Sequence, residues 1–170
     1  VACGGGEVLL ALGRRASRAG LDVELHGCDV SATALGHARE AAARRGLAVH
    51  LHQLDVLSDP LPGDFDLVTS TLFLHHLERE DVVSLLHRVA SSARGGVIQD
   101  LIRSTLGYTL AWTGLRILSR SRVAWVDGPR SVEAGFSLDE VRRLAEEAQL
   151  PSPRVQRVWP ERFLLQWGKA

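Results

Sequence analysis

The sequence lacks several features that would place it in a specialised class of protein. It carries no net charge, with 20 basic and 20 acidic residues, so nothing favours binding to nucleic acid or to an acidic membrane surface. No apolar run approaches the roughly 18 to 20 residues of a membrane span, so we expect no stable membrane insertion. The two Cys, Cys3 and Cys28, are expected to be packed as reduced thiols. We expect a cytoplasmic location.

Methionine is also absent. A complete translation product begins with Met, so we expect residues 1–170 to be a single domain trimmed at its N-terminus. A chain of 170 residues with 45% apolar content is long enough for one domain with a real core. It is too short for two domains of ordinary size.

Apolar periodicity alternates between strand and helix spacing along the first two thirds of the chain. Helices are predicted at 8–19, 32–45 and 81–93, and strands at 21–28, 47–54, 65–71 and 95–102. Such alternation requires right-handed crossovers. The predicted class is therefore α/β, a doubly wound, mostly parallel Rossmann-like sheet with helices on both faces.

The C-terminal third changes character. We predict a helix at 105–118, a loop at 119–135, a helix at 138–150 and strands at 154–159 and 162–167. Only Pro160 and Glu161 separate the last two strands. So short a link predicts a hairpin, which places one antiparallel strand at the sheet edge.

The most informative motif is Val-Ala-Cys-Gly-Gly-Gly-Glu at residues 1–7, followed by an apolar run that ends in Asp29. A glycine turn, a helix and a second strand tipped with an acid form a nucleoside-binding arrangement. The backbone comes close where side chains are absent, and the carboxylate accepts hydrogen bonds from ribose hydroxyls. A dinucleotide fingerprint, counted from Gly4 and Gly6, would need glycine where Leu9 stands.

Taken together, the glycine turn, the acids Asp29 and Asp55, and the terminal hairpin resemble the class I S-adenosylmethionine-dependent methyltransferases. The resemblance covers essentially the whole chain. It implies a seven-stranded sheet whose first strand is largely missing here, and S-adenosylmethionine as the cofactor. Residues 65–77 are similar to the fourth-motif region of the quinone-biosynthesis methyltransferases. An acid that the family usually has before the glycine turn would precede Val1.

The resemblance also implies a set of cofactor contacts. Asp29 would bind the ribose hydroxyls, and Asp55, with Val56 beside it, would lie near the adenine amino group. The whole implied set is Ala2, Cys3, Gly4, Gly6, Asp29, Val30, Asp55, Val56 and Thr71. Each acid has a plainer alternative role, because Asp29 can cap the next helix and Asp55 begins a stretch of ordinary loop composition.

His75, His76 and Asp100 are the candidate catalytic residues. Neutral imidazole titrates near working pH, and methylation of a hydroxyl requires loss of a proton. The alternative is that both histidines fill a loop and cap the next helix. Asp100 ends the predicted strand at 95–102, where open α/β sheets place ligands. Arg103 is its expected partner or a solvent contact.

A helical segment over the acceptor is expected after that strand. We predict a lid insertion at 104–136, with Tyr108 and Trp112 one helical turn apart. A core helix and a membrane-facing patch are the alternatives. The predicted substrate contacts are His76, Arg103, Tyr108 and Trp112.

No metal site is expected. His50 and His52 share a strand face as a metal pair would, but no carboxylate or Cys falls at ligand spacing. The predicted activity is methyl transfer from S-adenosylmethionine to a small, largely apolar acceptor, such as a hydroxylated aromatic, a polyketide or a quinone precursor. An NAD(P)-binding oxidoreductase and an inactive cofactor-binding protein are the alternatives. The acceptor atom and the oligomeric state are left open.

Overall fold

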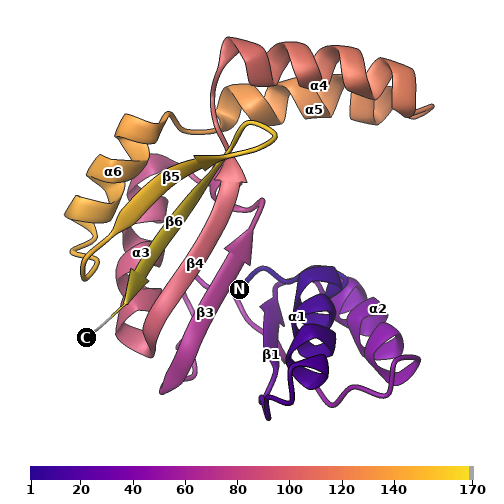
Figure 1. Ribbon diagram of the computed structural model, residues 1–170, viewed down its shortest axis with the longest axis vertical. Coiled ribbons are helices and arrows are strands. Elements are labelled where there is room, and N and C mark those ends of the chain that lie inside the picture. Colours follow the sequence, from indigo (N-terminus) through magenta and orange to yellow (C-terminus); the bar gives the residue numbers. More distant parts are fainter. Residues whose placement is uncertain (169–170) are drawn as a thin grey trace. The chain divides into compact units, whose positions relative to one another are not determined.

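The computed structural model describes residues 1–168, which form two compact units, Val1–Leu61 and a second unit beginning at Pro62 (Figure 1). The first unit alternates helices and strands: α1 (Glu7–Arg18), β1 (His26–Asp29), α2 (Ala32–Ala43) and β2 (His50–Gln53). β1 and β2 are parallel, with Asp29 opposite Gln53. Both strands therefore end at the same edge, and the residues that follow them share it.

Both strands of the first unit are shorter than predicted. Periodicity predicted strands at 21–28 and 47–54, whereas pairing is confined to His26–Asp29 and His50–Gln53. The alternating residues Leu21 and Val23 are 61% and 45% exposed. Alternation determines which face a side chain takes, but only pairing with a neighbouring strand makes a ladder.

The second unit is built on a four-stranded mixed sheet. Its elements are β3 (Phe65–Thr71), η1 (Leu74–His76), α3 (Arg79–Ser92), β4 (Ala93–Leu101), α4 (Thr105–Leu118), α5 (Arg122–Ala134), α6 (Leu138–Glu147), β5 (Arg154–Val158) and β6 (Arg162–Gly168). The strand order is β3-β4-β6-β5, with β4 parallel to β3 and β6 antiparallel to both of its neighbours. The strand predicted at 65–71 and the helix predicted at 105–118 are confirmed with the same bounds.

The antiparallel strand lies inside this sheet, so its predicted place at the edge is wrong. β6 sits between β4 and β5, and β5 forms the edge. Phe163, Leu165 and Trp167 of β6 are buried, whereas β5 reads Arg-Val-Gln-Arg-Val. The apolar strand is paired on both sides, and the polar strand takes the side that faces solvent.

The α/β class is confirmed, and the sheet of the second unit is mixed. The resemblance implied seven strands in one sheet, whereas the described residues contain six strands in sheets of two and four. Ahead of the glycine turn, the Cys3 N–H donates to the Cys28 carbonyl at 2.9 Å. Within the described chain, β1 has β2 as its only strand partner.

Residues 119–135, predicted to be a loop, contain the helix α5. Gly128 and Pro129, which disfavour helix, lie inside it. α5 packs so closely against α4 that a Cβ atom at Gly128 would lie 2.0 Å from Leu115 Cδ1. The prediction was wrong because packing against α4, which local propensity does not include, supplies the stability of this helix.

α4 and α5 lie side by side beyond the end of β4 (Figure 1). After α5 the chain returns to the residues that follow β4. Ile102 forms a bridge with Phe136, and the Arg103 N–H donates to the Phe136 carbonyl at 3.1 Å. Among the described helices, none combines the length and the apolar content needed to cross a membrane.

Candidate functional site

The glycine turn of the first unit leaves part of its backbone open. Gly4 and Gly6 have φ angles of +51° and +80°, a region that residues with a Cβ rarely adopt. A Cβ at Gly6 would lie 3.1 Å from Ala38 Cβ, whereas one at Gly4 would meet nothing within 4 Å. Gly6 therefore lets the turn pack against α2, and Gly4 presents backbone that a ligand can approach.

Asp29 ties the end of β1 to this turn. Its Oδ2 accepts the Gly4 N–H at 2.8 Å, and its Oδ1 accepts the Ser31 N–H at 2.9 Å. The Ser31 bond is the local turn expected of an Asp at a strand end. The Gly4 bond reaches 25 residues back along the chain. A carboxylate can accept about four hydrogen bonds, so Asp29 keeps capacity for a ligand.

Ala2, Cys3 and Val30 flank this contact. Cys3 and Cys28 are free thiols, as predicted. Burial raises the pKa of the Cys3 thiol and the charge of Asp29 raises it further, so the thiol stays protonated at neutral pH. Ala2 has a φ of +48°, and Val30 is 63% exposed. These residues offer backbone and apolar contacts rather than a nucleophile.

Asp55, just past β2, uses its carboxylate within its own turn. Oδ1 accepts the Leu57 N–H at 2.9 Å, and Oδ2 accepts the Ser58 hydroxyl at 3.0 Å. Val56 is buried, with 4% exposure. The adenine contact of Asp55 stays a prediction.

Asp100 is a fully buried carboxylate at the end of β4. Its Oδ2 accepts the N–H groups of Phe73 and Leu74 at 2.8 and 2.6 Å. Its Oδ1 accepts the Leu101 N–H at 2.7 Å and the Nδ1–H of His75 at 2.6 Å. These donors fill the acceptor capacity of a carboxylate. The geometry thus favours a positioning role for Asp100 over its predicted role as a base.

His75 is buried, with 9% exposure. Because its Nδ1–H donates to Asp100, the neutral ring keeps Nε2 as its acceptor. An imidazole that a buried carboxylate holds in one tautomer has the arrangement of a general base. His76 is exposed, and its ring centroid lies 4.1 Å from that of His75.

Thr71, the last of the implied cofactor contacts, ends β3, where it is paired with Gln99 of β4.

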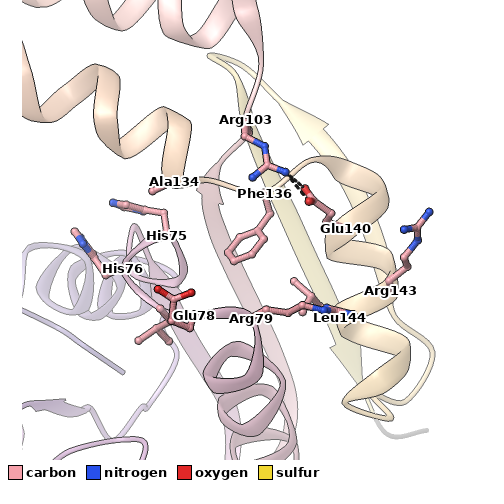
Figure 2. A pocket seen from close by; sticks show the side chains of 11 residues that line it. His75, His76, Glu78, Arg79, Arg103, Ala134, Phe136, Glu140, Arg143 and Leu144 are labelled. Atoms are coloured by element: carbon pink, nitrogen blue, oxygen red, sulfur yellow. Dashed lines mark hydrogen bonds and ion pairs between the residues drawn. The ribbon is translucent and has the colours of Figure 1, made fainter.

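Both histidines line a pocket of about 500 Å³ within the second unit (Figure 2). Figure 2 shows the Phe136 ring extending between the histidines and Leu144. The lining is partly apolar and partly charged: Leu77, Ala134, Phe136 and Leu144 with Glu78, Arg79, Arg103, Glu140 and Arg143. The pocket can hold a molecule that has both an apolar body and a polar group.

Glu140 anchors Arg103 at this pocket. Nη2 of Arg103 donates to both carboxylate oxygens, at 2.5 and 2.6 Å. Glu140 also accepts the Ser137 N–H at 2.7 Å in the capping box that begins α6. Burial raises the pKa of Glu140, but the bonds from Ser137 and Arg103 outweigh burial and lower the pKa below its usual range. Of the two roles expected of Arg103, pairing with Asp100 is wrong, because the Asp100 carboxylate faces η1; the Arg103 side chain is 48% exposed and contacts solvent.

Tyr108 and Trp112 lie one turn apart on α4 and are 38% and 45% exposed. The Arg116 guanidinium lies 3.9 Å from the centroid of the Trp112 ring. This exposure rules out a fully buried core role for the two aromatic side chains. Neither lines the pocket of Figure 2, so their contact with an acceptor stays a prediction.

Sequence reasoning missed Phe136, Glu140 and Arg143 as pocket residues. Phe136 followed a segment predicted as loop, and nothing local distinguishes Arg143. Only Glu140 carried a signal, the Ser137-x-x-Glu140 capping pattern, and that pattern predicts a helix start rather than a site.

Residues 1–96 match a protein family described as a methyltransferase domain. The chain belongs to this methyltransferase family. The match runs from the glycine turn into β4 and includes Asp29, Asp55 and His75. It confirms the resemblance to the class I methyltransferases. A comparison with the curated proteins found no match.

Solved structures similar to this methyltransferase-family chain agree on the fold. An O-methyltransferase family 2 protein from Planctomyces limnophilus, in complex with apigenin, is 18% identical with a TM-score of 0.73, over 99% of this chain and 48% of that one. Magnesium protoporphyrin IX methyltransferase from Synechocystis, with bound SAH, is 17% identical with a TM-score of 0.67, over 99% and 71%. A SAM-dependent methyltransferase from Aquifex aeolicus is 19% identical with a TM-score of 0.70, over 98% and 78%. The chain spans about half the length of several structures that it matches.

Proposed function

We propose that the chain binds S-adenosylmethionine through its first unit and transfers the methyl group to a small molecule. The observation that carries this proposal is the contact of Asp29 with Gly4. It places a carboxylate with spare acceptor capacity beside open backbone, and ribose hydroxyls are suitable donors for such a carboxylate. The family match supports the proposal, as do the similar methyltransferases, one of which was solved with bound SAH.

The residues of this chain have distinct roles in the proposed reaction. S-adenosylmethionine supplies a methyl group on a sulfonium, ready for in-line displacement. The protein contributes mainly orientation, which can lower the barrier substantially. His75 is the proposed general base: its Nε2 takes the proton from the hydroxyl group of the molecule that is methylated. Asp100 acts through His75 as a positioning residue, because it fixes the tautomer.

The proposed acceptor has an apolar body and an ionisable hydroxyl, as a hydroxylated aromatic, a polyketide or a quinone precursor does. The mixed lining of the pocket, with Phe136 and Leu144 near Arg103 and Glu140, supports this chemistry. Segment 104–136 is the proposed lid, since it leaves and rejoins the unit at one place. Within the family, residues 65–77 favour the quinone-biosynthesis subgroup.

Calorimetric titration with S-adenosylhomocysteine tests this proposal. Asp29→Ala should weaken binding by about 1 to 3 kcal/mol, or about 5- to 150-fold, because ribose hydroxyls lose a charged acceptor. Glu40→Ala is the matched control, since Glu40 is an exposed acid on α2 of the same unit, and it should bind as wild type does.

Three outcomes would contradict the proposal or narrow it. Unchanged affinity in Asp29→Ala removes Asp29 from the site. Binding of NADH in place of S-adenosylhomocysteine favours the oxidoreductase alternative. Binding without methyl transfer to any of a panel of small phenols, in an assay with tritiated methyl donor, favours an inactive binding protein.

A further inference from the structure

Three imidazoles lie on one face of the two-stranded sheet of the first unit. His26 is in register with His50, and Cys28 is in register with His52. Side chains alternate between the faces of a strand, so His26, His50 and His52 share a face. The His26 ring stacks on both others, with centroids 4.7 Å from His50 and 5.3 Å from His52.

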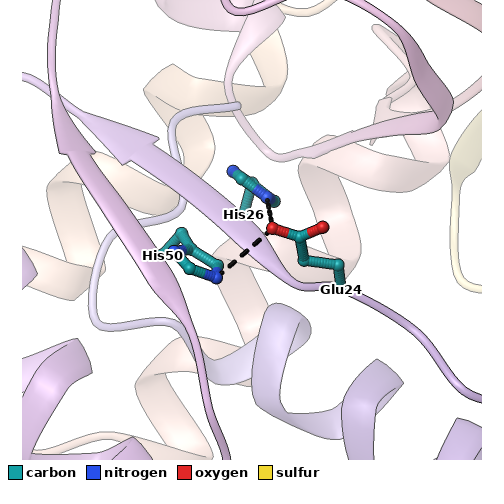
Figure 3. A group of neighbouring side chains, drawn as sticks. All are labelled: Glu24, His26 and His50. Carbon is teal, nitrogen blue, oxygen red and sulfur yellow. Dashed lines mark hydrogen bonds and ion pairs between the residues drawn. The ribbon is translucent and has the colours of Figure 1, made fainter.

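Glu24 adds a carboxylate to this cluster (Figure 3). Its Oε1 lies 2.9 Å from His26 Nε2 and 3.3 Å from His50 Nε2. One ligand atom from each of the three residues lies within 4.8 Å of the others. Four ligands at about 2.0 to 2.1 Å around a tetrahedral Zn²⁺ are about 3.3 Å apart, so small shifts suffice to close the site. Sequence reasoning expected no metal site, because it looked for a carboxylate near His50 and His52 on β2, whereas Glu24 precedes β1.

His52 orients the central imidazole. His26 Nδ1 lies 3.1 Å from His52 Nε2. When that nitrogen of His26 carries the proton and donates to His52, the Nε2 lone pair of His26 points at Glu24. In this tautomer a metal ion between the two atoms satisfies both lone pairs; without the ion, a proton on His26 Nε2 donates to Glu24 instead. A metal-bound histidine usually donates its other N–H to a neighbour in this way, which fixes its tautomer.

The cluster is open to solvent. The side chains of Glu24 and His50 are 71% and 56% exposed, and that of His26 is 24% exposed. Glu24, His50 and Asp22 line a hollow of about 410 Å³. An ion can therefore enter with water in its remaining coordination positions.

We propose that Glu24, His26 and His50 bind a divalent transition-metal ion, with Zn²⁺ as the best fit and His52 as the residue that positions His26. Two imidazoles, one carboxylate and an open position form a ligand set that Zn²⁺ accepts, whereas Mg²⁺ prefers oxygen ligands. The ion would join the start of β1 to β2. Asp29, the proposed ribose ligand, ends β1 three residues after His26, which is about 10 Å at ~3.3 Å per residue. The ion therefore belongs to a site separate from that of the methyl donor.

Competition between the full chain and a chromophoric zinc chelator tests this site, with the protein stripped of metal and free of any histidine tag. One equivalent of Zn²⁺ should bind to wild type, and Mg²⁺ should not compete. His50→Ala and Glu24→Gln should each weaken binding by at least about tenfold, and His52→Ala by about tenfold. His37→Ala, an exposed histidine on α2, should leave binding unchanged.

Zn²⁺ should also raise the melting temperature of wild type and His37→Ala, but not that of His50→Ala. Equal Zn²⁺ binding by wild type and the double variant Glu24→Gln, His50→Ala would overturn the proposal, as would a stoichiometry near zero. Glu24 is largely exposed, so Glu24→Gln is expected to keep its fold and gives a clear answer even if a histidine variant does not fold. Donor binding, measured separately with S-adenosylhomocysteine, should be unaffected by these variants.

Discussion

Replacing Asp100 by Asn places an amide where every neighbouring group is a donor. If the NH₂ replaces Oδ2, it faces the N–H groups of Phe73 and Leu74. If it replaces Oδ1, it faces the Leu101 N–H and His75 Nδ1. The second orientation costs less, because His75 can change tautomer and accept the amide hydrogen at Nδ1. Only the Leu101 N–H then loses its partner.

The magnitude follows from these contacts. One buried N–H without a partner costs about 1 to 3 kcal/mol. The bonds from Phe73 and Leu74 persist but lose their charged acceptor, which removes about 1 kcal/mol more in total. The expected loss is about 3 kcal/mol, or roughly 6 to 12 °C in melting temperature for a chain of this size.

The same substitution should switch the His75 ring. With Nδ1 accepting from the amide, the proton moves to Nε2, which can no longer accept one. Long-range ¹H–¹⁵N correlation spectra report the tautomer directly, and loss of the signal in His75→Gln assigns it. With a methyl acceptor available, turnover should fall by about 10² to 10⁴ if His75 is the base.

Asp66→Asn is the matched control. Asp66 lies on β3 of the same sheet, its side chain is 90% exposed, and it pairs with Arg94 at 3.5 Å. This exposed pair should be worth less than about 1 kcal/mol. An Asp100→Asn protein that melts within about 2 °C of wild type and keeps the wild-type His75 tautomer would refute the reasoning.

Three further variants test other parts of the fold. Gly96→Ala should destabilise by about 1 to 3 kcal/mol or more in urea unfolding, because its Cβ would lie 2.1 Å from the Trp167 ring; wild-type stability would contradict the packing of β4 on β6. Glu140 has a lowered pKa, so its charge stabilises the fold above about pH 4.5 and that contribution is lost as the pH falls through the lowered value. The difference in melting temperature between wild type and Glu140→Gln should therefore be largest at neutral pH and should shrink in acid. Trp112→Ala should cost well under the ~3 to 5 kcal/mol of a buried Trp and leave the S-adenosylhomocysteine Kd within about twofold; loss of both stability and donor binding would argue against the lid.

Local signals in the sequence were sufficient for a large part of the fold. The apolar run at 65–71 and the helix at 105–118 appear with the predicted bounds. Ser31 and Ser137 are helix-capping residue types that stand directly before the predicted helices, and each accepts a backbone N–H three residues ahead. The candidate cofactor residues Gly4 and Asp29 were also found from their order along the chain, and the structure joins them by a hydrogen bond.

Other features depended on contacts between distant segments. The helix α5 contains glycine and proline and forms against α4. β6 lies inside the sheet because its apolar side chains are buried there, although the short hairpin link alone is equally compatible with an edge position. Asp100 was expected to face a ligand or Arg103, but it accepts N–H groups from a turn 26 and 27 residues earlier.

The sequence by itself determined the order of elements, the glycine turn with its acid, and the helix starts, because backbone preference and apolar period act over a few neighbouring residues. Only the tertiary structure decided which side chains meet. Strand register brings Glu24, His26 and His50 together from separate segments, and the packing of β4 against η1 gives His75 its carboxylate partner. Such contacts depend on register and packing between segments about 25 residues apart, and no local pattern encodes either of them.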